Sequence, residues 1–136
     1  MTDDIPDEVR GFIFHYIDSV AKIEALLLMR SQPEQEWDAS LLARRLYIDP
    51  GETARILTDL STAGFCAPTP GKNGFYCFWP ATPEIRNRIE QVAEVYARRL
   101  IPVTHLIHQR AAQPSNRSLQ MFADAFKLTK DPNKEK

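Results

Sequence analysis

The stretch from Trp37 to Trp79 most strongly limits the folds that this sequence can adopt. In it, two helix patterns are followed by two short strand patterns. The first helix is predicted to begin at Asp38, whose carboxylate can accept hydrogen bonds from the free N–H groups of the first turn. The second is predicted to begin after Asp49, with Pro50 in the first helical position, where no N–H group is needed. Only a short turn therefore separates the two helices.

The second helix of this pair is amphipathic. Its buried face is predicted from apolar and small residues at helical spacing, with Gly64 as the C-terminal stop: Thr53, Ile56, Leu57, Leu60 and Ala63. The opposite face would then present mainly polar side chains to a partner: Glu52, Ala54, Arg55, Thr58, Asp59 and Thr62.

Two strand-like runs follow this helix, residues 65–69 and 75–79, separated by residues 70–74. The connecting segment contains Gly71, Asn73 and Gly74, residue types that tolerate the positive φ angles of tight hairpin turns. Pro68 and Pro70 cannot donate hydrogen bonds to a ladder, so the first strand is predicted to be short or to lie at an edge.

The order helix, turn, helix and hairpin resembles that of the winged helix-turn-helix bacterial transcription regulators, MarR-like and PadR-like proteins in particular. The resemblance covers about the middle half of the chain and is carried by residues 40–46, residues 53–64 and the hairpin. It implies a mostly α winged-helix fold with a small β-hairpin wing. It also implies a helix that enters the major groove, a wing that touches the neighbouring DNA backbone, and a dimer.

Helical patterns also flank this module. The 136-residue chain fits one winged-helix domain over residues 1–110, with a core at 19–80 and flanking helices at 6–17 and 83–109. Pro102 is predicted to kink or interrupt the last of these helices near Arg98. Residues 111–136 are predicted to be a linker and a short amphipathic basic tail, whose segment 118–130 could bind a protein partner.

The helix at 83–109 carries apolar residues in steps of three and four, the spacing of a coiled-coil-like seam. This pattern predicts a homodimer interface, although the same helix could instead fold back on its own domain. The predicted interface residues are Ile85, Ile89, Val92, Tyr96, Val103 and Leu106.

The sequence contains no phosphate-binding loop or hydrolase motif, so we expect no enzyme activity, metal or cofactor. His105 and His108 lie three apart, but no further ligands accompany them at a convincing spacing. Cys66 and Cys77 would lie opposite each other if the hairpin were centred between Gly71 and Lys72. That register would permit a redox-sensing disulfide, whereas a cytoplasmic location favours two reduced thiols.

The sequence favours one function, transcriptional regulation through DNA binding, and leaves one alternative. In the first, a dimeric regulator binds double-stranded DNA, with base contacts from Arg55 and Thr58 and phosphate contacts from helix N–H groups near Gly51. Further phosphate contacts are predicted for Arg44, Arg45, Lys72 and Asn73. In the second, the same fold is a protein-interaction module, an adaptor or anti-regulator, that does not bind DNA specifically.

Charge and hydropathy bear on both functions. The net charge of −1 argues against an indiscriminate nucleic-acid binder, and Glu52 and Asp59 reduce the positive charge of the presented helix. No apolar run approaches the roughly 20 residues of a membrane span. The acidic N-terminus lacks the charge pattern of a signal peptide, so we expect a cytoplasmic protein without a membrane partner.

Overall fold

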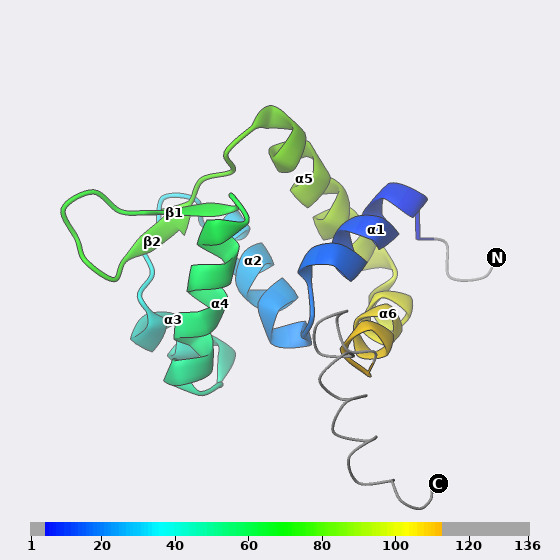
Figure 1. Cartoon of the computed structure of the whole chain (residues 1–136), viewed down its shortest axis with the longest axis horizontal. Helices are drawn as coiled ribbons and strands as arrows, with labels where there is room; N and C mark the ends of the chain where they lie inside the picture. Colours follow the sequence, from blue (N-terminus) through cyan, green and yellow to red (C-terminus); the bar gives the residue numbers. More distant parts are fainter. Residues whose placement is uncertain (1–4, 113–136) are drawn as a thin grey trace, which may run out of the picture.

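The computed structural model describes residues 5–112, which form six helices and one antiparallel hairpin (Figure 1). This arrangement confirms the predicted mostly α winged-helix fold. The predicted linker and basic tail lie outside the described residues, except for the last two residues of the final helix. The elements are α1 (Asp7–Tyr16), α2 (Val20–Ser31), α3 (Ala39–Leu46), α4 (Pro50–Thr62), β1 (Cys66–Pro68), β2 (Tyr76–Phe78), α5 (Pro83–Arg98) and α6 (Leu100–Ala112).

Local side-chain caps define where four of the helices begin. Asp38 accepts from the Leu41 N–H at 2.8 Å and so begins α3, as predicted. Asp49 accepts from the Glu52 N–H at 3.0 Å at the start of α4. Ser19 and Thr82 act in the same way at the starts of α2 and α5. Each cap satisfies an N–H group that has no partner inside its own helix.

The hairpin has a register in which Cys66 pairs with Phe78 and Pro68 with Tyr76. Its strands are shorter than the predicted runs, three residues each, because the prolines on the first run cannot extend the ladder. Trp37 adds a third stretch of extended backbone: its N–H and carbonyl both bond to Tyr76, each at 2.8 Å. The wing is thereby joined to the start of α3.

The C-terminal helical region consists of two helices, α5 and α6, where the sequence predicted a helix at 83–109 that is kinked or interrupted near Arg98. The break lies at Arg99, whose φ of −127° and ψ of 51° are not helical. Pro102 explains it, since it has no N–H to donate to the carbonyl of Arg98 and its ring crowds that turn. The predicted interruption near Arg98 is thus confirmed to within one residue.

Most of the predicted dimer seam faces the interior of the same chain, which corrects that prediction. Ile89, Val92, Val103 and Leu106 are buried in the core cluster, while Ile85 and Tyr96 pack partly buried against it. The reason is that α1 contacts both α5 and α6 and the chain covers the stripe itself. The fold-back alternative left open by the sequence is the arrangement found.

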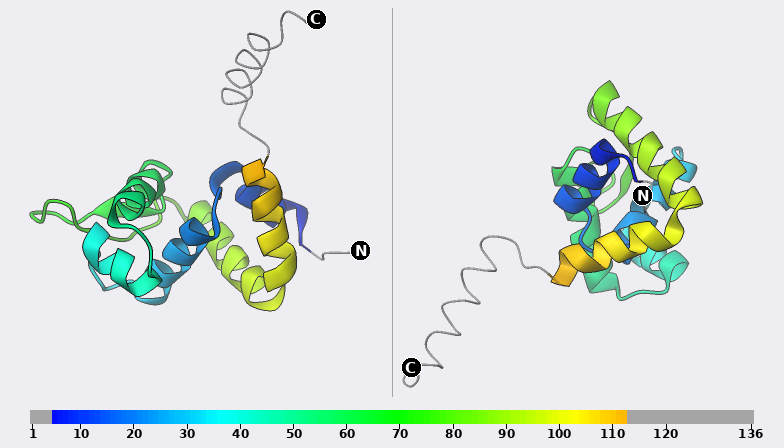
Figure 2. Two further views of the ribbon diagram at one scale, coloured as in Figure 1. Left: turned by 90° about the horizontal axis from the view of Figure 1, so that it is seen from below. Right: turned by 90° about the vertical axis from the view of Figure 1, so that its right-hand side faces the viewer.

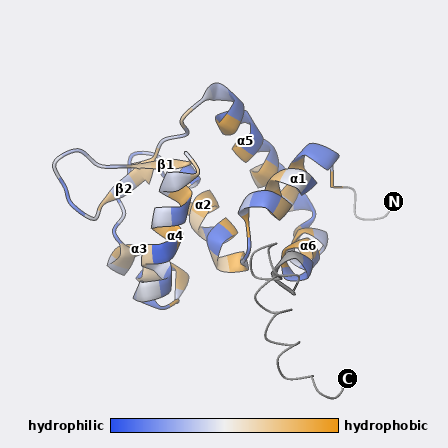
Figure 3. Cartoon of the chain, viewed as in Figure 1, coloured by the Kyte–Doolittle hydropathy of each residue, from blue (hydrophilic) through white to orange (hydrophobic). Residues whose placement is uncertain are grey.

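The elements are grouped toward two ends of the molecule. One end holds α3, α4 and the hairpin, and the other holds α1, α5 and α6, with α2 between them (Figures 1 and 2). The apolar sides of the helices face inward at both ends (Figure 3). Among residues 5–112, no helix combines the length and apolar character needed to cross a bilayer.

Candidate nucleic-acid interface

Helix α4 presents the side chains predicted to meet DNA because its opposite side is fixed in the core. Ile56, Leu57 and Leu60 are buried, and this orients Arg55 and Thr58 toward solvent. The Thr58 hydroxyl donates to the Ala54 carbonyl at 3.1 Å. It can therefore accept a hydrogen bond from a base edge, but its single proton is already used.

The start of α4 is occupied by its own cap. The Asp49 carboxylate lies so close to Gly51 that a Cβ there would come within 2.9 Å of its Oδ2. Glycine at position 51 thus leaves room for the cap. Because Asp49 accepts from the Glu52 N–H, the predicted phosphate contact near Gly51 would compete with a carboxylate already in place.

The two arginines of α3 are exposed in different settings. The Arg45 guanidinium lies 5.4 Å from the centroid of the Trp37 ring, a cation–π arrangement that holds its position. Arg44 is exposed one position earlier. Within residues 5–112, neither guanidinium forms an ion pair with a carboxylate, so both keep their charge available for phosphates.

At the wing, the two predicted phosphate contacts differ. The Lys72 ammonium forms an ion pair with Glu36 and lies 4.7 Å from the Phe75 ring centroid. Its charge is therefore largely compensated within the chain. Asn73 is exposed beside it at the tip of the hairpin. The wing thus offers DNA a polar tip with little net positive charge.

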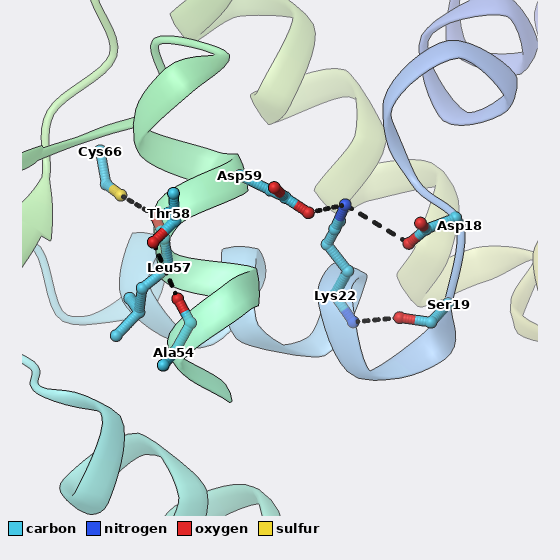
Figure 4. Close-up of polar contacts among 8 residues, drawn as sticks. All are labelled: Asp18, Ser19, Lys22, Ala54, Leu57, Thr58, Asp59 and Cys66. Carbon is cyan, nitrogen blue, oxygen red and sulfur yellow. Dashed lines mark hydrogen bonds and ion pairs between the residues drawn. The ribbon is translucent and has the colours of Figure 1, made fainter. Parts of the chain in front are cut away.

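A buried lysine that no sequence pattern had indicated forms an ion pair with Asp59 of α4. The Lys22 ammonium lies 3.1 Å from an Asp59 carboxylate oxygen and 3.3 Å from an Asp18 oxygen (Figure 4). Lys22 itself is only 7% exposed. Asp59 is therefore ion-paired, but Lys22 is shared with Asp18, so the three groups together keep one negative charge. The pairing reduces the acidic character of the presented helix without cancelling it. The only local signal was Asp18 at i−4 of Lys22, because Asp59 is 37 residues away in sequence.

An open groove of about 440 Å³ lies beside this ion-pair cluster, between the end of α1 and the end of α4. Tyr16 and Phe65 contribute aromatic rings to it, and Lys22 and Asp59 contribute charge. Spacing in the sequence had indicated no such groove, because its walls come from helices that are distant along the chain.

The hairpin register separates the two cysteines, which corrects the idea of a redox disulfide. Ala67, not Cys66, lies opposite Cys77, so the two thiols are on neighbouring positions whose side chains point to opposite faces. Both are free. Burial, with a smaller contribution from the nearby Cys77, raises the pKa of the Cys66 thiol to about 12.

Among the described residues, no three histidines, cysteines or carboxylates gather closely enough to hold a metal ion. His105 and His108 are exposed on α6.

Comparison with solved structures supports the fold assignment. The near-atomic-resolution structure of Sco5413, a MarR family transcriptional regulator from Streptomyces coelicolor, matches with a TM-score of 0.51 at 20% identity. That match covers 90% of this chain and 80% of Sco5413. RV1404 from Mycobacterium tuberculosis is a weaker match, with a TM-score of 0.46 at 20% identity over 87% of this chain and 82% of RV1404. No family model and no curated protein matches the sequence.

At this identity, the likeness to Sco5413 shows a shared fold. It agrees with the MarR-like resemblance drawn from residues 40–46, residues 53–64 and the hairpin.

Proposed function

We propose that this chain is a winged-helix transcriptional regulator that binds double-stranded DNA as a dimer. The observation that carries the proposal is the solvent-exposed Arg55 on α4, the helix whose Asp59 is ion-paired with the buried Lys22. Arg44 and Arg45 extend the positive charge onto α3. The fold shared with Sco5413, which is described as a MarR family transcriptional regulator, supports the same function.

In this proposal, Arg55 reads a base edge in the major groove while Arg44 and Arg45 hold phosphates. Thr58 accepts a hydrogen bond from a base, and Asn73 contacts the backbone from the wing tip. Lys72 contributes less than the sequence predicted, because Glu36 compensates its charge. The helix N-terminus near Gly51 also contributes less, because Asp49 already caps it.

The dimer contact in this proposal is formed by apolar residues that the chain leaves exposed at the junction of α5 and α6. Leu100 is 49% exposed and Ile101 is 71% exposed, directly after the break at Arg99. Burying two large, adjacent, solvent-exposed aliphatic side chains is favourable, and we infer that a second copy of the chain buries them.

Fluorescence anisotropy tests the proposal with two labelled duplexes, one random and one from the DNA upstream of the protein's own gene, at two salt concentrations. We expect preferential binding to the upstream DNA that weakens steeply as salt rises, because phosphate contacts release counterions. No binding at micromolar protein would contradict the proposal. It would favour the protein-interaction alternative, whose predicted tail 118–130 lies outside the described residues.

Arg55→Ala tests whether Arg55 contacts a base edge in the major groove. We expect specific binding to fall by about tenfold or more, since a good bidentate base contact contributes about 1–3 kcal/mol of discrimination. Arg88→Ala is the matched control, because it removes the same charge from α5, outside the proposed DNA contacts and the proposed dimer contact. A folded Arg55→Ala protein that still prefers the upstream DNA would remove Arg55 from the proposed interface.

A further inference from the structure

Tyr47, in the turn between α3 and α4, has an unusual backbone conformation for its residue type. Its φ of 59° and ψ of 46° place it in the left-handed region, and among residues 5–112 no other non-glycine residue has a positive φ. Many helices end with a residue in this conformation. It is usually glycine, which has no Cβ, or asparagine, whose short polar side chain can hydrogen-bond locally. The hydrogen bond that closes the turn is made by the backbone alone, because the Tyr47 N–H donates to the Ala43 carbonyl. The Tyr47 side chain takes no part in it.

The Tyr47 side chain gains nothing inside the chain that would offset this strain. It is 92% exposed, the highest exposure among the large apolar and aromatic residues of the described part. Its hydroxyl makes no hydrogen bond, and its ring makes no aromatic or cation contact, within residues 5–112. A strained residue whose side chain does nothing for the fold points to a contact outside it.

The position of Tyr47 indicates what that contact is. It lies two residues before Asp49, the N-cap of α4, and three residues after the exposed Arg44. In helix-turn-helix proteins the N-terminal residues of the second helix reach the base edges, so the preceding turn faces the sugar–phosphate backbone beside the groove. A phenol hydroxyl is among the groups that donate to phosphate oxygens.

We infer that Tyr47 is a phosphate-contacting residue of the DNA interface, and that its side chain is retained at this strained position for that contact. This inference rests on the proposed DNA-binding function and adds to it a residue that the sequence analysis did not select. The Tyr47 hydroxyl donates to a phosphate oxygen that flanks the entry of α4 into the major groove. Being uncharged, it adds affinity without releasing a counterion.

Two substitutions test the role of the Tyr47 hydroxyl and the cost of the Tyr47 backbone conformation separately. Tyr47→Phe keeps the ring and the backbone conformation but removes the donor, so DNA affinity should fall by about three- to tenfold with no change in thermal midpoint. Tyr47→Asn relieves the strain, because asparagine tolerates the left-handed region. We expect its thermal midpoint to rise by about 2–4 °C while DNA affinity falls.

Tyr16→Phe is the matched control for the lost hydroxyl. The Tyr16 ring packs 5.0 Å from Phe12 and 5.1 Å from Phe65, at the other end of α4 from the turn. This variant should bind DNA as the unmodified protein does. Arg44→Ala provides a second comparison: it should reduce the slope of log affinity against log salt by about one, whereas Tyr47→Phe should leave the slope unchanged.

The outcomes distinguish failure of this inference from failure of the proposed function. If the unmodified protein binds no DNA, both fail. If it binds and Tyr47→Phe binds equally well, only the phosphate contact of Tyr47 is overturned. A Tyr47→Asn protein that is less stable than the unmodified protein would also overturn the inference, because Tyr47 would then serve the fold.

Discussion

At the scale of single residues, the two cysteines show how a one-residue register decides chemistry. Successive side chains on a strand point to opposite faces, so the pairing of Cys77 with Ala67 sends Cys66 to the core and leaves Cys77 partly exposed. The Cys66 thiol lies 3.9 Å from the Leu57 carbonyl of α4 (Figure 4). It therefore serves packing between the wing and α4.

The same geometry predicts unequal thiol reactivity. Because burial raises the pKa of the Cys66 thiol to about 12, very little of it is thiolate at pH 8, and only the thiolate reacts. We expect iodoacetamide at that pH to modify Cys77 at least about a hundredfold faster than Cys66 in the folded protein, measured by peptide mass spectrometry. Urea-unfolded protein is the control, in which both should react at similar rates. Equal rates in the folded protein would contradict the buried placement.

At the scale of elements, ion pairs connect helices that are far apart in sequence. The Arg30 guanidinium on α2 binds Glu90 on α5 in a bidentate arrangement, with distances of 2.6 and 3.0 Å. Hydrogen bonds from Arg30 lower the pKa of the Glu90 carboxyl. Because the folded pKa is below the unfolded one, the pair stabilises the fold above the unfolded pKa, and this contribution is lost as pH falls through the folded pKa.

Glu90→Gln tests this pair. Both partners are partly exposed, so we expect a loss of about 0.5–1 kcal/mol in the free energy of unfolding at pH 7, and a smaller loss at an acidic pH below the ordinary glutamate pKa of about 4.3. Urea denaturation at the two pH values measures it. Glu94→Gln, which breaks a pair with Arg98 inside α5, is the control and should cost about 0.5 kcal/mol or less. An equal loss at both pH values would show that Glu90 acts through packing.

At the scale of the whole molecule, the two ends have separate tasks in the proposed regulator. The end with α3, α4 and the hairpin carries the candidate DNA contacts, and α1, α5 and α6 form the other end (Figure 2). Leu100 and Ile101 of α6 are exposed there. Lys22, on α2 between the two ends, holds Asp18 and Asp59 together. It therefore ties the start of α2 to the proposed recognition helix.

Ile101→Asp tests the proposed dimer contact. Because Ile101 is exposed, the substitution should leave the thermal midpoint of the monomer fold nearly unchanged while a charge is introduced into an apolar contact. We expect multi-angle light scattering to show a dimer for the unmodified protein and a monomer for the variant. Asn87→Asp, which adds the same charge to an exposed site on α5, should remain dimeric. A dimeric Ile101→Asp protein would place the contact elsewhere.

The sequence alone determined the elements whose causes lie within a few residues. The caps at Asp38 and Asp49 form because a short polar side chain meets N–H groups three positions ahead. The break near Pro102 follows from a missing N–H group. The buried stripe of α4 also followed from spacing, and with it the exposure of Arg55.

Only the tertiary structure decided what covers each surface. An apolar stripe has the same spacing whether its own chain or a second copy covers it, so the sequence could not place Ile89 and Val92 in the core. The pairing of Lys22 with Asp59, and of Lys72 with Glu36, joins residues 37 and 36 positions apart. Such contacts depend on how helices and strands pack against one another. The packing energy is the sum of many weak contacts across the whole chain, so it cannot be read from a local sequence pattern.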